Sequence, residues 1–214
     1  MSVTTIHAIH RLLRKQFDSV DSPVARLMAA RTNDPFRVLV TTILSARTKD
    51  ETTGAAAQRL FSEVRSLSDL RTIPLGRLDL LIGKVGFHQV KARCLKQLPD
   101  TLDTLFGGTI PNTVEKLVQL PGVGRKTANL VVTDAFDKPG ICVDVHVHRI
   151  CNRLGLVKTR NPTETEMALR RLLPKKYWKT WNHYLVAFGQ TVCRPVHPKC
   201  QGCPLYAHCR RVGV

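Results

Sequence analysis

Three groups of residues in this sequence have types and spacings that can do chemistry. Lys126 follows a glycine-rich segment, Asp144 lies further along the chain, and four cysteines gather near its C-terminal end. A lysine amine can attack carbon as a nucleophile, and a carboxylate can move a proton or stabilise a developing positive charge. Four thiolates can bind zinc or an iron–sulfur cluster. These residue types allow covalent catalysis and a metal centre in one chain.

Lys126 stands just after a predicted turn at 120–124, which leads into a helix expected over about 125–136. The glycines Gly122 and Gly124 allow positive φ and close backbone approach, and a helix start presents N–H groups and a positive dipole end to an anion. A plain turn between two helices is the alternative, and a Gly-x-Gly pair alone would favour it. The full Pro-Gly-Val-Gly-Arg-Lys-Thr-Ala string and the net charge reverse that preference. We therefore predict a phosphate-binding turn that includes Arg125.

The composition favours a polyanionic partner. Lysine and arginine number 33 against 16 aspartates and glutamates, a formal net charge of +17, and phosphate neutralisation would drive binding to nucleic acid. A membrane surface is the competing anion, but no stretch approaches the roughly 18 consecutive apolar residues of a spanning helix. Residues 1–17 lack the apolar region of a signal peptide, although a transit peptide is an alternative for this basic start. We expect a cytoplasmic, nucleoid-associated protein without membrane contact.

Lys126 needs help to act as a nucleophile. An ordinary lysine has a pKa of about 10.4, so only about one amine in 2,500 is neutral at pH 7. A helix end lowers that pKa by about 1.5 units at most, so desolvation by bound DNA or a nearby base must contribute. Asp144 is the candidate base. By sequence alone, an ordinary N-cap for the helix that ends before Gly155 is the preferred interpretation, and the two roles are compatible. Because a fixed carboxylate favours the protonated amine, its use would be proton transfer or stabilisation of positive charge.

The cysteines follow the pattern Cys193-x6-Cys200-x2-Cys203-x5-Cys209. Zinc sites with four cysteines are common, but they usually pair two close Cys-x2-4-Cys units, and this pattern has only one such pair. The spacing also differs from that of ferredoxins. In a reducing compartment, the pattern indicates a metal centre and leaves the metal open.

These motifs together resemble the endonuclease III family of helix-hairpin-helix DNA glycosylases, over about residues 25–210. The resemblance implies that Lys126 attacks the sugar C1′ and that Asp144 is the family's essential aspartate. It also implies that Cys193, Cys200, Cys203 and Cys209 bind a [4Fe-4S] cluster. In the family this cluster orders a basic loop for DNA contact, here Arg194, His197 and Lys199.

Two further segments resemble the family less specifically. Residues 43–50 match a segment whose glutamine fills the gap left by a flipped nucleotide, and Arg47 stands in its place. Residues 85–88 match a loop that inserts an apolar wedge, which makes Phe87 the candidate, with burial in the core as the alternative. We also assign His146 and Arg149, which follow Asp144, to the DNA-binding site. Trp178 and Trp181 are expected to be core or interface aromatics.

Helical periodicity predominates, so we predict an all-α fold. Ser22-Pro23, Asp34-Pro35 and Asn161-Pro162 each offer an N-cap followed by proline, and Asn112 with Glu115 resembles a capping box that opens a helix ending near Leu120. The family architecture implies a six-helix barrel domain over 24–136 with the helix-hairpin-helix. A cluster-bearing helical domain would be made from 1–23 and 137–214, with a DNA-binding cleft between the two.

The implied function is base-excision repair by a bifunctional DNA glycosylase and AP lyase. The resemblance implies oxidised pyrimidines as substrates, a lysine Schiff base and strand cleavage by β-elimination, on double-stranded DNA with a damaged base or abasic site. We expect a monomer. A mismatch-specific glycosylase of the same fold, acting on thymine, uracil or adenine, is the first alternative, and a non-enzymatic helix-hairpin-helix DNA-binding protein is the second.

Overall fold

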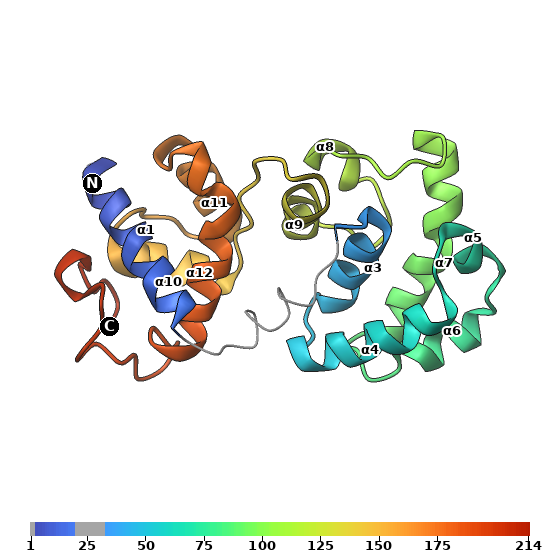
Figure 1. Ribbon diagram of the computed structural model, residues 1–214, viewed down its shortest axis with the longest axis horizontal. Coiled ribbons are helices and arrows are strands. Elements are labelled where there is room, and N and C mark those ends of the chain that lie inside the picture. The colour runs from blue at the N-terminus through green and yellow to red at the C-terminus, as the bar shows by residue number, and fades with distance from the viewer. Residues whose placement is uncertain (1–2, 20–32) are drawn as a thin grey trace. The chain divides into compact units, whose positions relative to one another are not determined.

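The computed structural model describes residues 3–19 and 33–214 (Figure 1). These residues form helices and loops and contain no strand, which confirms the all-α prediction. They divide into two compact units, one formed by 33–138 and the other by 3–19 with 139–214. The predicted N-cap at Ser22-Pro23 lies outside the described residues. Within the described ranges, no helix has the length and apolar character needed to cross a membrane.

The unit formed by 33–138 is built around one almost entirely buried helix. Asp34 caps this helix as predicted, because its carboxylate accepts a hydrogen bond from the Phe36 backbone N–H at 2.9 Å and Pro35 follows at the first helical position. Apolar residues cover most of its circumference, as in a helix surrounded by others. The helices of this unit are α3 (Pro35–Ser45), α4 (Asp50–Glu63), α5 (Leu67–Thr72), α6 (Leu75–Ile82), α7 (His88–Phe106), α8 (Val114–Leu117) and α9 (Arg125–Phe136).

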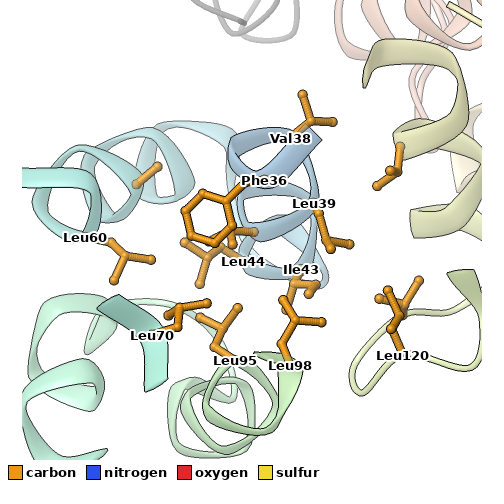
Figure 2. Close-up of a cluster of buried hydrophobic side chains, with 14 of the residues drawn as sticks. Phe36, Val38, Leu39, Ile43, Leu44, Leu60, Leu70, Leu95, Leu98 and Leu120 are labelled. Atoms are coloured by element: carbon orange, nitrogen blue, oxygen red, sulfur yellow. The ribbon is translucent and has the colours of Figure 1, made fainter. Parts of the chain in front are cut away.

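Helix α3 packs against α4, α7 and α9. Figure 2 shows Leu39, Ile43 and Leu44 of α3 gathered with Leu95 and Leu98 of α7. Each of these side chains is at most 1% exposed. Burial of this kind stabilises by about 1.5–3 kcal/mol per large aliphatic side chain, so α3 fixes the positions of the helices around it.

The helix before the glycine turn is shorter than predicted. Helix α8 ends at Leu117 rather than near Leu120, and its N-cap is Thr113, without a side-chain capping bond, so the capping box at Asn112 was wrong. Short i to i+3 hydrogen bonds replace the helical pattern from here, including Leu120 N–H to the Leu117 carbonyl at 3.1 Å. Helix α9 begins at Arg125 and ends at Phe136, as predicted.

The second unit packs its helices on a fully buried tryptophan. Trp181 is 0% exposed and Trp178 is 7% exposed, which confirms both as core residues. The first helix of the chain places Ile6, Ile9 and Leu13 at helical spacing in the same core. The helices of this unit are α1 (Val3–Asp18), α10 (Val145–Leu154), α11 (Pro162–Leu172) and α12 (Trp178–Thr191), with the short 3₁₀ helices η1 (Lys175–Tyr177) and η2 (Tyr206–His208).

His10 lies on the face of α1 that contacts η1 and α12. His10 stacks on Tyr177 at 3.9 Å between ring centroids, and its Nε2 lies 2.9 Å from the Thr180 hydroxyl. Burial lowers the pKa of His10 from 6.5 to about 4, with smaller contributions from the positive charges of Arg14, His7 and Lys176. The unfolded chain therefore binds more protons than the folded chain between these two values. Stability from neutral His10 is complete above pH 6.5 and is lost as the pH falls toward 4.

We predict that His10→Gln reduces the acid sensitivity of the fold. The melting temperature of the wild type should fall more steeply between pH 7 and pH 4.5 than that of His10→Gln, because glutamine has no proton to gain. Thermal denaturation by circular dichroism across this range measures the difference. His197→Gln, which changes an exposed histidine, is the control and should keep the wild-type slope. Equal slopes for wild type and His10→Gln would contradict the prediction.

Candidate active site and metal centre

Lys126 lies at the second position of α9, with its side chain exposed. The opposite face of the helix holds it in place, because Ala128, Val131 and Val132 are buried in the core of the unit. Gly124 is the N-cap and has extended backbone, and as a glycine it makes no side-chain capping bond. A Cβ at Gly124 would meet nothing within 4 Å. The exposed Lys126 side chain thus lies next to a helix start whose cap residue is not covered by neighbouring atoms.

The glycine turn before Lys126, residues 120–124, packs closely against α7. Gly122 has a φ of 77°, and a Cβ there would lie 3.2 Å from the Cβ of Cys94 and 3.5 Å from the Ile43 side chain. Gly122 therefore has both the positive φ and the close approach that favour glycine, whereas Gly124 has a φ of −92°. Arg125, the first residue of α9, is exposed. The turn is therefore fixed by its contacts with α3 and α7, and its basic side chains point outward.

Asp144 is the N-cap of α10, which confirms the capping role predicted for it. Its Oδ1 accepts hydrogen bonds from the backbone N–H groups of His146 and Val147, both at 2.9 Å. The helix it caps is anchored by Ile150 and Leu154 in the core and ends before Gly155, as predicted. Asp144 is partly exposed. Its carboxylate is therefore fixed by two backbone bonds and remains accessible to solvent.

His146 and Arg149 pack against α12 and the cysteine loop, residues 193–209. Arg149 Nη2 donates to the Cys193 carbonyl at 2.8 Å and lies 3.2 Å from His146 Nδ1. Gly189 of α12 makes room for both, because a Cβ there would lie 2.3 Å from His146 Nδ1. The structure thus gives Arg149 partners within its own unit, and its contact with DNA stays a prediction.

Arg153 was missed by the sequence reasoning and clamps the start of the cysteine loop. It is 9% exposed and donates to the carbonyls of Arg194 at 2.7 Å and Pro195 at 2.9 Å. It also lies 3.6 Å from the Cys193 sulfur. The sequence did offer one signal for this role, because Arg153 is an arginine on the apolar face of α10, one turn after Arg149. Helix α10 therefore carries Asp144 at one end and holds the cysteine loop along its length.

All four cysteines line one cavity, together with apolar side chains that include Ile150, Leu154 and Phe188. Burial raises the pKa of Cys203 and Cys209, and the charges of the other cysteines raise it further. The Arg211 backbone N–H donates to the Cys209 sulfur at 3.3 Å. As arranged, the described residues contain no group of three or more His, Cys, Asp or Glu side chains that could hold a single metal ion. Four cysteines, an apolar lining and N–H donors to sulfur fit the ligand set of a [4Fe-4S] cluster.

The structure brings together Arg47 and Phe87, which come from separate sequence motifs. The guanidinium carbon of Arg47 lies 5.6 Å from the centre of the Phe87 ring. Phe87 is 60% exposed, so the alternative that it is a core residue was wrong. The basic loop residues Arg194, His197 and Lys199 are exposed as well. These side chains are accessible to a ligand.

Comparison with known proteins identifies the family. The family model described as HhH-GPD superfamily base excision DNA repair protein matches residues 40–175. Endonuclease III of Thermotoga maritima is 47% identical over 176 residues, which cover 82% of this chain and 83% of that protein. Endonuclease III-like protein 1 of Bos taurus is 39% identical, covering 92% of this chain and 70% of that protein. Endonuclease III homolog 2 of Arabidopsis thaliana is 41% identical, and the alignment covers 55% of that longer protein.

Solved structures agree with the sequence comparison. The structure of a trapped covalent intermediate between endonuclease III and DNA matches with a TM-score of 0.87 and 32% identity, covering 99% of this chain and 97% of that chain. A thermostable thymine-DNA glycosylase matches with a TM-score of 0.83 at 24% identity, which shows a shared fold. The chain belongs to the HhH-GPD superfamily of base excision DNA repair proteins and, within it, to the endonuclease III family of DNA glycosylases with AP lyase activity.

Proposed function

We propose that Lys126 is the nucleophile of a bifunctional glycosylase and AP lyase that acts on double-stranded DNA containing an oxidised pyrimidine or an abasic site. The observation that carries the proposal is the exposed Lys126 amine at the start of α9, beside a glycine N-cap with open space around it. A helix N-terminus attracts the phosphate of a DNA strand, which brings the deoxyribose within reach of the amine. The similarity to a covalent endonuclease III–DNA intermediate supports this assignment.

The proposed reaction begins with attack of the Lys126 amine on C1′ of the deoxyribose. The bond between C1′ and the base breaks, and the base leaves with the electron pair and takes up a proton. The bonded nitrogen then loses one proton, and the C1′–O4′ bond breaks with its electron pair going to O4′, which takes up a proton; this gives a protonated Schiff base between the lysine nitrogen and C1′. This cation acidifies the C2′ hydrogen, whose removal breaks the C3′–O bond and releases the strand 3′ to the lesion as a 5′-phosphate.

We assign proton transfer and stabilisation of positive charge to Asp144. Its carboxylate is oriented by two backbone N–H groups at the start of α10. The lysine must be neutral when it attacks, so a base that accepts its proton and contact with DNA that removes water both favour the reaction. A carboxylate can also stabilise the positive charge that develops on the sugar as the base leaves.

The remaining predicted residues are proposed to hold the DNA. Gly122, Gly124 and Arg125 would grip the strand at the glycine turn, and Arg47 and Phe87 would occupy the opened duplex. His146 and Arg149 would face the damaged nucleotide, where Arg149 also holds the Cys193 carbonyl. The basic loop, namely Arg194, His197 and Lys199, would contact phosphates. We further propose that the protein acts as an intracellular monomer.

Cys193, Cys200, Cys203 and Cys209 are proposed to bind a [4Fe-4S] cluster. When bound, the cluster cross-links the ends of the cysteine loop and so fixes the backbone that carries the basic loop residues. The chain's own contribution is the Arg153 clamp and the apolar lining of the cavity.

A second candidate function is that of a mismatch-specific glycosylase of the same fold. Arg47 favours this candidate, because the endonuclease III pattern has a glutamine at this position beside the flipped base. Such relatives commonly lack the nucleophilic lysine and do not cleave the strand. The presence of Lys126 therefore favours the bifunctional enzyme.

Borohydride trapping on duplex DNA with an abasic site tests the nucleophile. Wild-type protein should form a covalent adduct, because borohydride reduces the Schiff base, and Lys126→Ala should form none. Lys116→Ala removes an exposed lysine of α8 and should trap as well as the wild type. No adduct with the wild type, or an undiminished adduct with Lys126→Ala, would contradict the proposal.

Asp144→Asn separates the structural from the chemical role of this residue. Asparagine is an equally good N-cap, so the melting temperature should stay close to that of the wild type. Loss of the carboxylate should lower the single-turnover rate of base excision by about 10²–10⁴-fold. Asp144→Ala should lower both the rate and the stability. If Asp144→Asn excised the base at the wild-type rate, the proposed chemical role of Asp144 would be wrong and only its capping role would remain.

Elemental analysis of anaerobically purified protein tests the cluster. We expect four iron atoms and four inorganic sulfides per chain, and Cys200→Ser should lower both. Zinc at one atom per chain, without sulfide, would contradict the assignment.

A further inference from the structure

Two non-glycine residues with left-handed backbone lie next to each other on the surface of the 33–138 unit. Arg47, which follows the C-cap of α3, has a φ of 54°, and Phe87, the N-cap of α7, has a φ of 58°. The N-cap residue of a helix normally has extended backbone. Such conformations cost free energy in residues with a side chain and persist only where the surrounding structure imposes them. Something must therefore hold these two residues in place.

Lys91, in the first turn of α7, joins the two segments. It is 7% exposed, and its ammonium donates to the carbonyls of Leu44 at 2.8 Å and Ala46 at 2.5 Å. It also donates to the Thr48 hydroxyl at 3.2 Å. The two carbonyls belong to the C-terminal end of α3, where backbone oxygens lack helical partners and a cation is favoured. Burial lowers the pKa of Lys91 to about 8, so the group remains an ammonium at neutral pH.

A second set of contacts, through the Thr48 hydroxyl, joins the same two segments. The Gly86 N–H donates to the Thr48 hydroxyl at 3.2 Å, and this hydroxyl donates to the Ala46 carbonyl at 3.3 Å. A Cβ at Gly86 would lie 2.7 Å from the Arg47 carbonyl oxygen. The residues just before Phe87 therefore touch the backbone of Arg47, and Lys91 and Thr48 supply the hydrogen bonds between them.

We propose that Lys91 is a positioning residue that holds Arg47 and Phe87 together as one preassembled element for opening the DNA duplex. The proposal rests on the function proposed above for these two side chains. Inserting a side chain between base pairs costs unstacking energy, so the free energy of stacking opposes the insertion. A ring and a guanidinium that are already oriented lose less freedom on binding, so more binding energy remains for unstacking.

Lys96 provides a matched control on the same helix. Its ammonium also donates to the carbonyls at a helix end, here Leu70 at 3.2 Å, Arg71 at 2.6 Å and Ile73 at 2.6 Å, around the C-terminus of α5. Lys96→Met therefore removes hydrogen bonds of the same chemistry, but at a helix end that carries neither Arg47 nor Phe87. Both substitutions keep a long apolar side chain in place of the lysine stem.

The test compares strand cleavage at an abasic site in duplex and in single-stranded DNA, because a single strand offers no base pairs to open. For Lys91→Met, we expect the ratio of duplex to single-strand rate to fall about tenfold or more, as for other misplaced binding groups. Lys96→Met should keep the wild-type ratio. A 2-aminopurine placed opposite the abasic site should brighten less with Lys91→Met than with the wild type. An unchanged ratio for Lys91→Met, or an equal fall for Lys96→Met, overturns the proposal.

A double-mutant cycle distinguishes positioning from general destabilisation. In an Arg47→Ala, Phe87→Ala background, Lys91→Met should lower the ratio no further, because the residues it positions are gone. A further fall of the same size overturns the proposal. If Lys91→Met does not fold, Thr48→Val replaces it, since this substitution removes the shared hydroxyl at constant size and should lower the ratio in the same direction.

The outcomes also separate this proposal from the function on which it rests. If Arg47→Ala and Phe87→Ala leave the duplex ratio unchanged, the duplex-opening role of these side chains fails, and the role of Lys91 fails with it. If they lower the ratio while Lys91→Met and Thr48→Val do not, the positioning role alone is overturned.

Discussion

Unsatisfied backbone groups at helix ends are the constraint on which the functional parts of this protein depend. Each helix leaves N–H groups at one end and carbonyls at the other without helical partners. Asp144 supplies acceptors at the start of α10, and Lys91 supplies donors at the end of α3. At the start of α9 the cap is Gly124, which has no side chain to offer. A helix end completed by a side chain fixes that side chain, whereas one with a glycine cap leaves space for a phosphate.

The same residues serve the fold and the proposed chemistry in the 139–214 part of the chain. Helix α10 presents Asp144 at its N-terminus, and its arginines Arg149 and Arg153 hold the backbone of the cysteine loop. The cysteine loop and Asp144 are therefore both attached to the same helix. A cluster that fixes the cysteines would consequently also restrain α10.

Local signals in the sequence were sufficient for several helix ends, although not for those of α8, and for the residue types of the site. The caps at Asp34 and Asn161 and the start of α9 follow from neighbouring residues and were confirmed. Contacts between distant segments could not be predicted in this way. Lys91 looked like any surface lysine, because its partners Leu44 and Thr48 lie more than forty residues earlier. The contact between Arg47 and Phe87 and the hydrogen bonds from Arg153 to the cysteine loop also join segments that lie far apart in the sequence.

Peptide mapping of the borohydride-reduced adduct tests the central claim most directly. The adduct is digested with a protease and a nuclease, and mass spectrometry locates the residue that carries the deoxyribose remnant. The account predicts a single modified residue, Lys126, bonded through its side-chain nitrogen. A remnant on any other lysine, or on the N-terminal amine, would contradict it.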